Sequence, residues 1–189
     1  MRCYVTSADR RREVAARLSR ETGVEVLAVE HPREAVEGCA IVTTATSSGQ
    51  PVFEAAWLRP GQHVNTMLGC DWFARRQEIE DEVVRLADVV VVNSKRQAVV
   101  DDQPEIMNSI RKGYVTWDKI FDVGELLTGK LHGRTNEYQL TLHDNNAGMG
   151  IQFAAAGARL VEKARAAGRG TKLPVDLFMT RRGEGVYAP

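Results

Sequence analysis

Four consecutive valines, Val89 to Val92, place the strongest constraint on how this chain can fold. A run this short and this apolar is typical of a strand buried on both faces, as in a parallel sheet covered by helices. Helical spacing over 9–22, ended by Gly23, indicates a helix with a glycine C-cap. Further strands are predicted at 2–6, 24–29, 40–44, 63–66 and 139–142, with short helices at 32–38 and 54–58. This alternation predicts an α/β fold with a doubly wound, mostly parallel sheet.

The C-terminal part differs in character from the rest of the chain. Residues 149–167 form a long alanine-rich segment whose apolar positions, among them Phe153 and Leu160, circle widely round a helix axis. We therefore expect two parts, an α/β domain over 1–148 and a helix with its tail over 149–189. Small residues on such a helix allow close packing against another element.

Charge and composition exclude several classes of partner. Lys plus Arg number 25 and Asp plus Glu number 25, so no net field draws the chain to nucleic acid or anionic lipid, and neither partner is predicted. No apolar run approaches the roughly 20 residues of a membrane span, and the first residues lack a signal-peptide core, so we expect a cytoplasmic protein. The spacing of the histidines and cysteines predicts no metal site.

The residues that follow the predicted strands are the candidates for binding and chemistry, because ligands of doubly wound sheets bind beyond the carboxyl ends of the strands. The segments 6–7, 43–48 and 65–70 are rich in hydroxyl-bearing and small residues, and Asp71 follows the last of them. Such residues let backbone amides approach a pyrophosphate or a nicotinamide, and a carboxylate there can act as a general acid or base. The same residues are also common in ordinary loops and helix caps, so the pattern alone leaves both interpretations open.

Several ordered motifs extend this argument. They are Ala40–Thr46 (AIVTTAT), Leu58–Asn65 (LRPGQHVN), Gly69–Asp71 followed by Glu78–Asp81, Gly124–Lys130 (GELLTGK), Gly133–Arg134, and the stretch from Thr141 to Gly148. In these motifs the chain resembles the ornithine cyclodeaminase and mu-crystallin family of NAD(P)-dependent proteins, over most of its length. The resemblance implies a Rossmann-like nucleotide-binding domain over 1–148.

The resemblance also implies a set of site residues. Asp71 would be the catalytic carboxylate beside the nicotinamide. The implied cofactor contacts are Thr6 near the adenosine ribose, Thr44 and Thr46 on the nicotinamide side, Leu68, Gly69 and Cys70 through their backbone, Arg75, and Asn146 or its neighbour Asn145.

The function implied by the resemblance is deamination and cyclisation of an amino acid, such as ornithine to proline, through hydride exchange at Cα. Two alternatives stay open: an NAD(P)H-dependent imine or ketimine reductase or amino acid dehydrogenase, and a non-catalytic cofactor- or ligand-binding protein or inactive fragment. The implied partner is a small amino or imino acid, and the full-length family form is expected to be a homo-oligomer.

The chain also departs from the family pattern. No strand with a GxGxxG turn precedes Arg2, so the first predicted strand corresponds to the second nucleotide-binding strand, and the central strand of the usual sheet is missing. Its two neighbours would then face an unpaired gap. The family's amino-terminal half is missing as well, which would leave the helix at 149–167 partly uncovered. Thr6 and Ser7, with Arg10 to Arg12 nearby, replace the acidic residue that binds the ribose of NAD, so the cofactor is predicted to be NAD or NADP.

Overall fold

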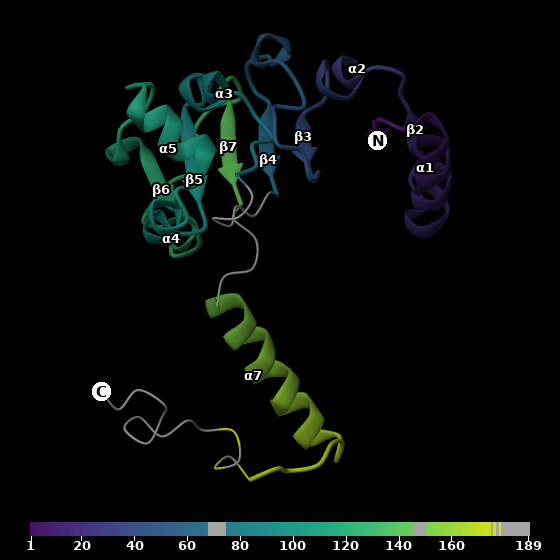
Figure 1. Cartoon of the computed structure of the whole chain (residues 1–189), viewed down its shortest axis with the longest axis vertical. Coiled ribbons are helices and arrows are strands. Elements are labelled where there is room, and N and C mark those ends of the chain that lie inside the picture. Colours follow the sequence, from purple (N-terminus) through teal and green to yellow (C-terminus); the bar gives the residue numbers. More distant parts are fainter. Residues whose placement is uncertain (68–74, 146–149, 175, 177, 179–189) are drawn as a thin grey trace, which may run out of the picture. The chain divides into compact units, whose positions relative to one another are not determined.

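The computed structural model describes residues 1–67, 75–145, 150–174, 176 and 178, in two compact units, Met1–Ala147 and Gly148–Pro189. In chain order the first unit contains β1 (Arg2–Cys3), α1 (Ala8–Thr22), β2 (Leu27–Ala28), α2 (Pro32–Val36), β3 (Ile41–Thr44), the 3-10 helix η1 (Ala55–Trp57), β4 (His63–Thr66), α3 (Asp81–Leu86), β5 (Val89–Val92), α4 (Lys95–Val100), α5 (Pro104–Arg111), the 3-10 helix η2 (Trp117–Lys119), β6 (Ile120–Asp122), α6 (Val123–Leu127) and β7 (Thr141–Asp144) (Figure 1). The second unit contains α7 (Gly150–Ala166).

The main sheet has five strands in the order β3-β4-β7-β5-β6, and every pair in it is parallel. This confirms the α/β fold with a parallel sheet, and all four valines of β5 are buried as a strand covered on both faces requires. The last strand was predicted at 139–142, whereas β7 begins and ends two residues later. Although it is last in the chain, β7 lies in the middle of the sheet between β4 and β5 (Figure 1).

The first two strands form a separate parallel sheet of their own. The Leu27 amide donates to the Met1 carbonyl at 2.8 Å and the Val29 amide donates to the Cys3 carbonyl at 3.1 Å. Both strands are shorter than predicted, since each has only one strand neighbour in the described structure. In the described structure β3 is an edge strand of the main sheet, and its Ile41 is 65% exposed. The described strands therefore form two separate sheets and not one continuous sheet.

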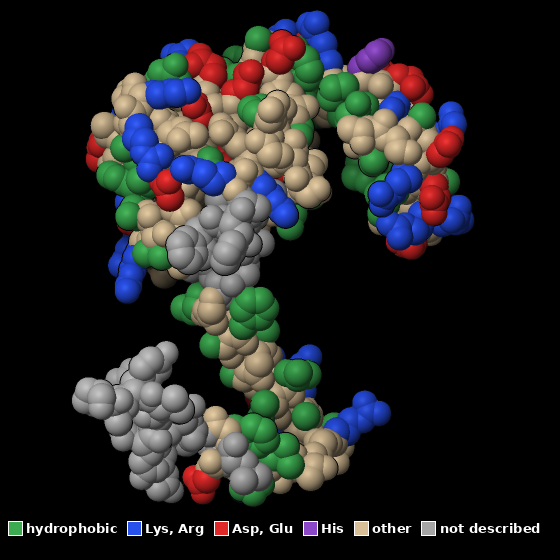
Figure 2. Space-filling view, in the orientation of Figure 1, with side chains coloured by type: hydrophobic (Ala, Val, Ile, Leu, Met, Phe, Trp, Pro, Cys, Tyr) green, Lys and Arg blue, Asp and Glu red, His purple; other side chains and the backbone are tan. Residues whose placement is uncertain are grey.

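Helix α7 is described by itself because it belongs to the second unit. Its 17 residues include no buried side chain, and Phe153 and Leu160 are about two-thirds exposed, at 68% and 70%. Figure 2 shows hydrophobic side chains along its length. Among the described residues, no helix, α7 included, has the length and hydrophobicity that a membrane span requires.

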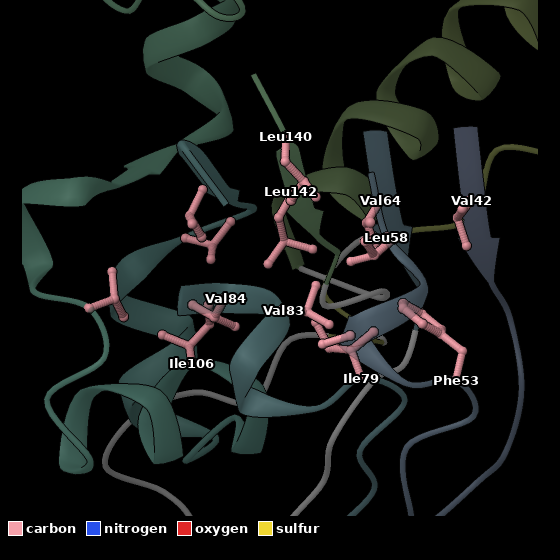
Figure 3. Close-up of a cluster of buried hydrophobic side chains, with 14 of the residues drawn as sticks. Val42, Phe53, Leu58, Val64, Ile79, Val83, Val84, Ile106, Leu140 and Leu142 are labelled. Atoms are coloured by element: carbon pink, nitrogen blue, oxygen red, sulfur yellow. The ribbon is translucent and has the colours of Figure 1, made fainter. Parts of the chain in front are cut away.

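The core is built on one straight row of residues across the main sheet. In register, and each at most 5% exposed, these residues are Val42, Val64, Leu142, Val90 and Ile120. Residues of α3 and α5, with Ile79 before them, cover this row (Figure 3). Because the row consists of one residue from each strand, it fixes the register of all five strands and brings their carboxyl ends to a common edge.

Candidate functional site

The carboxyl edge of the main sheet carries a row of buried polar residues. Thr44, Thr66 and Asp144 are the last residues of β3, β4 and β7, and they pair with one another in register. All three are at most 5% exposed, and the Thr66 hydroxyl donates to Oδ1 of Asp144 at 2.7 Å. Ligands of doubly wound sheets bind beyond the carboxyl ends of the strands. This edge, with its buried polar residues, is therefore the candidate site.

Glu78 is the centre of the hydrogen-bond network at this edge. Its Oε1 accepts from the amide and hydroxyl of Thr46 at 2.5 and 2.7 Å, and its Oε2 accepts from the Thr44 hydroxyl at 2.9 Å and the Met67 amide at 3.2 Å. The side chain is fully buried. Sequence reasoning used Glu78 only as part of a family motif and assigned it no role. A glutamate next to an acidic run is normally taken for a solvated helix start, so no local signal distinguishes it.

Glu105 is a second buried carboxyl group in the same network. It lies in the first turn of α5, is 1% exposed, and its Oε1 accepts from the Glu78 amide at 3.0 Å. Burial, together with the negative charges of Asp144 and Glu78, raises the pKa of Glu105 to about 8. Burial likewise raises the pKa of Asp144 to about 6, against the opposing hydrogen bond from Thr66. At neutral pH the Glu105 side chain is therefore a neutral acid next to the Glu78 carboxylate.

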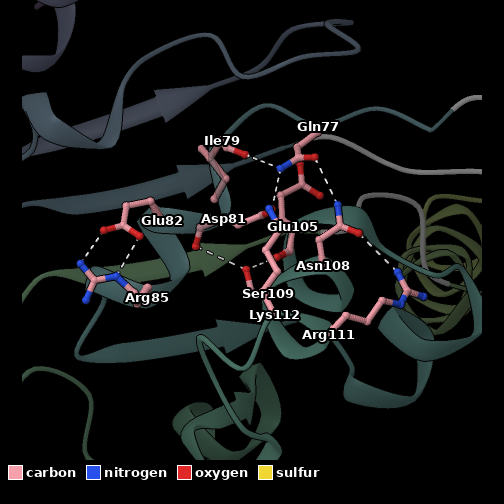
Figure 4. Close-up of polar contacts among 10 residues, drawn as sticks. All are labelled: Gln77, Ile79, Asp81, Glu82, Arg85, Glu105, Asn108, Ser109, Arg111 and Lys112. Carbon is pink, nitrogen blue, oxygen red and sulfur yellow. Dashed lines mark hydrogen bonds and ion pairs between the residues drawn. The ribbon is translucent and has the colours of Figure 1, made fainter.

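The position of Glu105 is set by contacts between α5 and α3. The Ser109 hydroxyl donates to the carbonyl of Glu105 at 2.7 Å and to that of Asp81 at 3.4 Å, while the Lys112 ammonium pairs with the Asp81 carboxylate at 2.5 Å (Figure 4). Gln77 adds a bond to Oδ1 of Asp81 at 2.8 Å. These bonds fix α5 against α3 and so fix Glu105 beside Glu78.

A second group of polar side chains lies at the ends of β5 and β7. Nε2 of His143 lies 3.1 Å from Oδ1 of Asn93, and Nδ2 of Asn93 donates to Oδ1 of Asn145 at 2.6 Å. Burial lowers the pKa of His143, so the imidazole is kept neutral. The structure thus brings Asn145 to the carboxyl edge, while its neighbour Asn146 lies outside the described residues.

The predicted site residues are only partly brought together. Thr44 and Thr46 share the Glu78 carboxylate, as described above. Thr6 is exposed and lies three residues beyond the end of β1. Arg75 forms an ion pair with Asp102 at 2.6 Å and lines a pocket with Gly49. The remaining predictions, Leu68, Gly69, Cys70, Asp71 and Asn146, lie outside the described residues.

Two of the three arginines near Thr6 and Ser7 are committed to other contacts. Arg11 is 5% exposed and donates to the carbonyls of Val5 and Val29 at 2.9 and 2.8 Å. Arg12 pairs with Asp9 at 2.7 Å on the surface of α1. Arg11 therefore joins the ends of β1 and β2, a structural role that the run of arginines gave no sign of.

A parallel sheet flanked by helices is the architecture of the Rossmann-like fold. Members of that class bind nucleotides at the carboxyl edge of the sheet, where this chain has its buried polar residues. Residues 1–168 match the model of the ornithine cyclodeaminase/mu-crystallin family. The chain therefore belongs to this family, which confirms the resemblance found in the sequence.

Three related proteins show how much of a family member this chain represents. A protein of Sinorhizobium fredii, named an uncharacterized cyclodeaminase, is 34% identical over 157 residues, which are 78% of this chain and 46% of that protein. The structure of Thermococcus litoralis Δ(1)-pyrroline-2-carboxylate reductase in complex with NADH and L-proline is 28% identical, with a TM-score of 0.79, over 91% of this chain and 52% of that one. An archaeal alanine dehydrogenase dimer with bound NAD is 25% identical, with a TM-score of 0.76, over 92% and 52%. The chain thus spans about half the length of these relatives.

Proposed function

We propose that this chain is the nicotinamide-binding part of an enzyme that exchanges hydride with the Cα of a small amino or imino acid. The observation that carries the proposal is the buried polar row at the carboxyl edge of a Rossmann-like sheet in a member of this family. Two related structures, the pyrroline-2-carboxylate reductase and the alanine dehydrogenase, hold NADH or NAD. The alanine dehydrogenase is a dimer, which supports a homo-oligomer for the full-length form.

Two described residues support the proposed binding of a nicotinamide dinucleotide. Thr46 is exposed beyond β3 although its amide is held by Glu78, so it offers a fixed, accessible surface for the nicotinamide side, next to Thr44. Thr6, an exposed residue three positions beyond the end of β1, is proposed to contact the adenosine ribose. The 189 residues contain no GxGxxG sequence, so this chain supplies no such glycine turn for the pyrophosphate.

Asp71 is proposed as the acid–base residue, with Leu68, Gly69, Cys70, Arg75 and Asn146 as further cofactor contacts. When bound, the nicotinamide takes up or delivers the hydride at the substrate Cα. A carboxylate beside that carbon can accept a proton from the substrate nitrogen or return one to it, which is the role given to Asp71.

Two reaction branches remain for this site. The cyclodeaminase named in Sinorhizobium fredii favours loss of ammonia from a diamino acid such as ornithine, giving proline. The Thermococcus litoralis reductase, with NADH and L-proline bound, favours reduction of a cyclic imine by the same hydride chemistry. A non-catalytic cofactor- or ligand-binding protein is the third candidate.

The first test is a fluorescence titration of the purified 189-residue chain with NADH and, in parallel, with NADPH. We expect saturable binding of NADH, and weaker binding of NADPH because Arg11 is buried and Arg12 is paired. Circular dichroism on the same samples verifies that the chain is folded. A folded chain that binds neither nucleotide would contradict the proposal.

Turnover separates the branches and the binding-only candidate. Ammonia release from L-ornithine with NAD identifies the cyclodeaminase, whereas oxidation of NADH by Δ(1)-pyrroline-2-carboxylate identifies the reductase. We expect one of these activities, and we expect Asp71→Asn to lower it while the matched exposed variant Asp118→Asn does not. A chain that binds NADH but turns over neither substrate would favour the binding-only candidate, and full activity in Asp71→Asn would remove Asp71 from the mechanism.

A further inference from the structure

Glu78 connects two segments that backbone pairing no longer holds. The register of β3 and β4 ends at Thr44 and Thr66, so Thr46 and Met67 both lie beyond the paired residues. One oxygen of Glu78 accepts from the Thr46 amide, and the other accepts from the Met67 amide at 3.2 Å. Oε2 also accepts from the Thr44 hydroxyl at 2.9 Å, so one side chain holds both segments.

The chemistry of these bonds requires an acceptor at both oxygens. The backbone amides of Thr46 and Met67 can only donate, and they bind different oxygens of Glu78. A glutamine in this place would turn an NH2 group toward one of the two amides, which is a donor facing a donor. The Glu78 side chain is buried at 0% exposure, and Glu105 lies beside it, with its Oε1 accepting from the Glu78 amide at 3.0 Å.

We infer that Glu78 is a positioning residue for the cofactor site, because it fixes the distance between the Thr44–Thr46 segment and Met67, the residue directly before Leu68–Asp71. This inference rests on the proposed function. Glu78 touches neither cofactor nor substrate in this assignment. It acts by holding Thr46 and Met67 in place, a role that no sequence motif assigned to it.

The test compares Glu78→Gln with Val84→Ala. Val84 lies in the core on α3 and is 1% exposed, so its truncation lowers stability. It removes none of the hydrogen bonds that Glu78 accepts from Thr46 and Met67. Below the melting temperature of both variants, we expect Glu78→Gln to weaken NADH binding at least tenfold and Val84→Ala to leave it unchanged. Wild-type affinity in Glu78→Gln, or an equal loss in both variants, would overturn the inference, since stability alone would then explain the data.

Amide hydrogen exchange tests the same inference without cofactor. In the wild-type chain the Thr46 and Met67 amides should be protected at least tenfold above unstructured values, although both lie beyond the ends of their strands. In Glu78→Gln this protection should be lost, while Val64 and Leu142 in the sheet keep theirs. A wild-type chain that binds no NADH would count against the proposed function alone, and the exchange rates would still decide the role of Glu78. If the Thr46 and Met67 amides were unprotected in the wild-type chain, the inference about Glu78 would be overturned. This measurement needs no variant, so it also holds where Glu78→Gln fails to fold.

Discussion

The free energy of unfolding is expected to fall by roughly 1 kcal/mol between pH 7 and pH 8. The cause is Glu105, whose pKa is raised from an ordinary 4.5 to about 8 by burial and by the charges of Asp144 and Glu78. A carboxyl group with a higher pKa in the folded state binds more protons when folded. Its stabilising contribution is therefore full at low pH, declines above the unfolded pKa, and is lost once the pH exceeds the folded pKa.

Other shifted groups determine the best pH window for this measurement. Asp144, with a pKa raised to about 6, acts in the same direction at lower pH. His63 and His143 have lowered pKa values because they are buried, so they stabilise the fold as the pH rises toward 6.5 and oppose Asp144 there. Above pH 7 both histidines are mostly neutral in the folded and the unfolded state, which leaves Glu105 as the main contributor.

Urea unfolding of Glu105→Gln should give a flat profile between pH 7 and pH 8. The glutamine oxygen still accepts from the Glu78 amide, so the variant removes the titration and keeps the hydrogen bond. Glu162→Gln, an identical change at a 66% exposed side chain on α7, should retain the wild-type slope. An unchanged slope in Glu105→Gln would show that another group causes the pH dependence.

Gly61→Ala is expected to lower the free energy of unfolding by roughly 2–4 kcal/mol, measured by urea denaturation. Gly61 has a φ of +86°, and an added Cβ would lie 2.5 Å from the Glu137 carbonyl oxygen. The close approach is part of the fold, because the Gly61 amide donates to the Tyr138 carbonyl at 2.8 Å. Alanine therefore meets both an unfavourable backbone conformation and a backbone atom that cannot move freely.

Gly129→Ala separates these two costs. Gly129 has a similar φ of +72°, but nothing lies within 4 Å of an added Cβ. This variant should lose only about 1 kcal/mol, the cost of a left-handed conformation for a residue with a side chain. Equal losses in the two variants would mean that the 137–138 segment moves away from the turn without cost.

The fold was largely readable from the sequence because its main signal is local. Val89 to Val92 predicted a strand buried on both faces, and the strand at His63–Thr66 was predicted with the observed bounds. The central position of β7 was not predicted. Hydrophobic periodicity reports which residues are buried, while strand order depends on which neighbours complete the core, as Leu142 does between Val64 and Val90.

Fewer residues of the candidate site could be predicted from the sequence, because two of the residues that organise it, Glu78 and Glu105, are acidic. Thr44 and Thr46 were identified as residues that follow a strand, which is a positional rule. Glu78 and Glu105 carry no such signal, since their burial is produced by tertiary contacts between the β4–α3 connection and α5. Arg11 was predicted only as one of the basic residues near the ribose, and its guanidinium instead donates to two backbone carbonyls.

The open edge of β3 has a consequence for association. The outer side of β3 has no strand neighbour in the described structure, so its backbone donors and acceptors can pair with an added strand. Ile41 at that edge is 65% exposed, and no Lys or Pro stands within β3 to discourage such pairing. At high protein concentration, this edge is where β-sheet aggregation of the chain would begin.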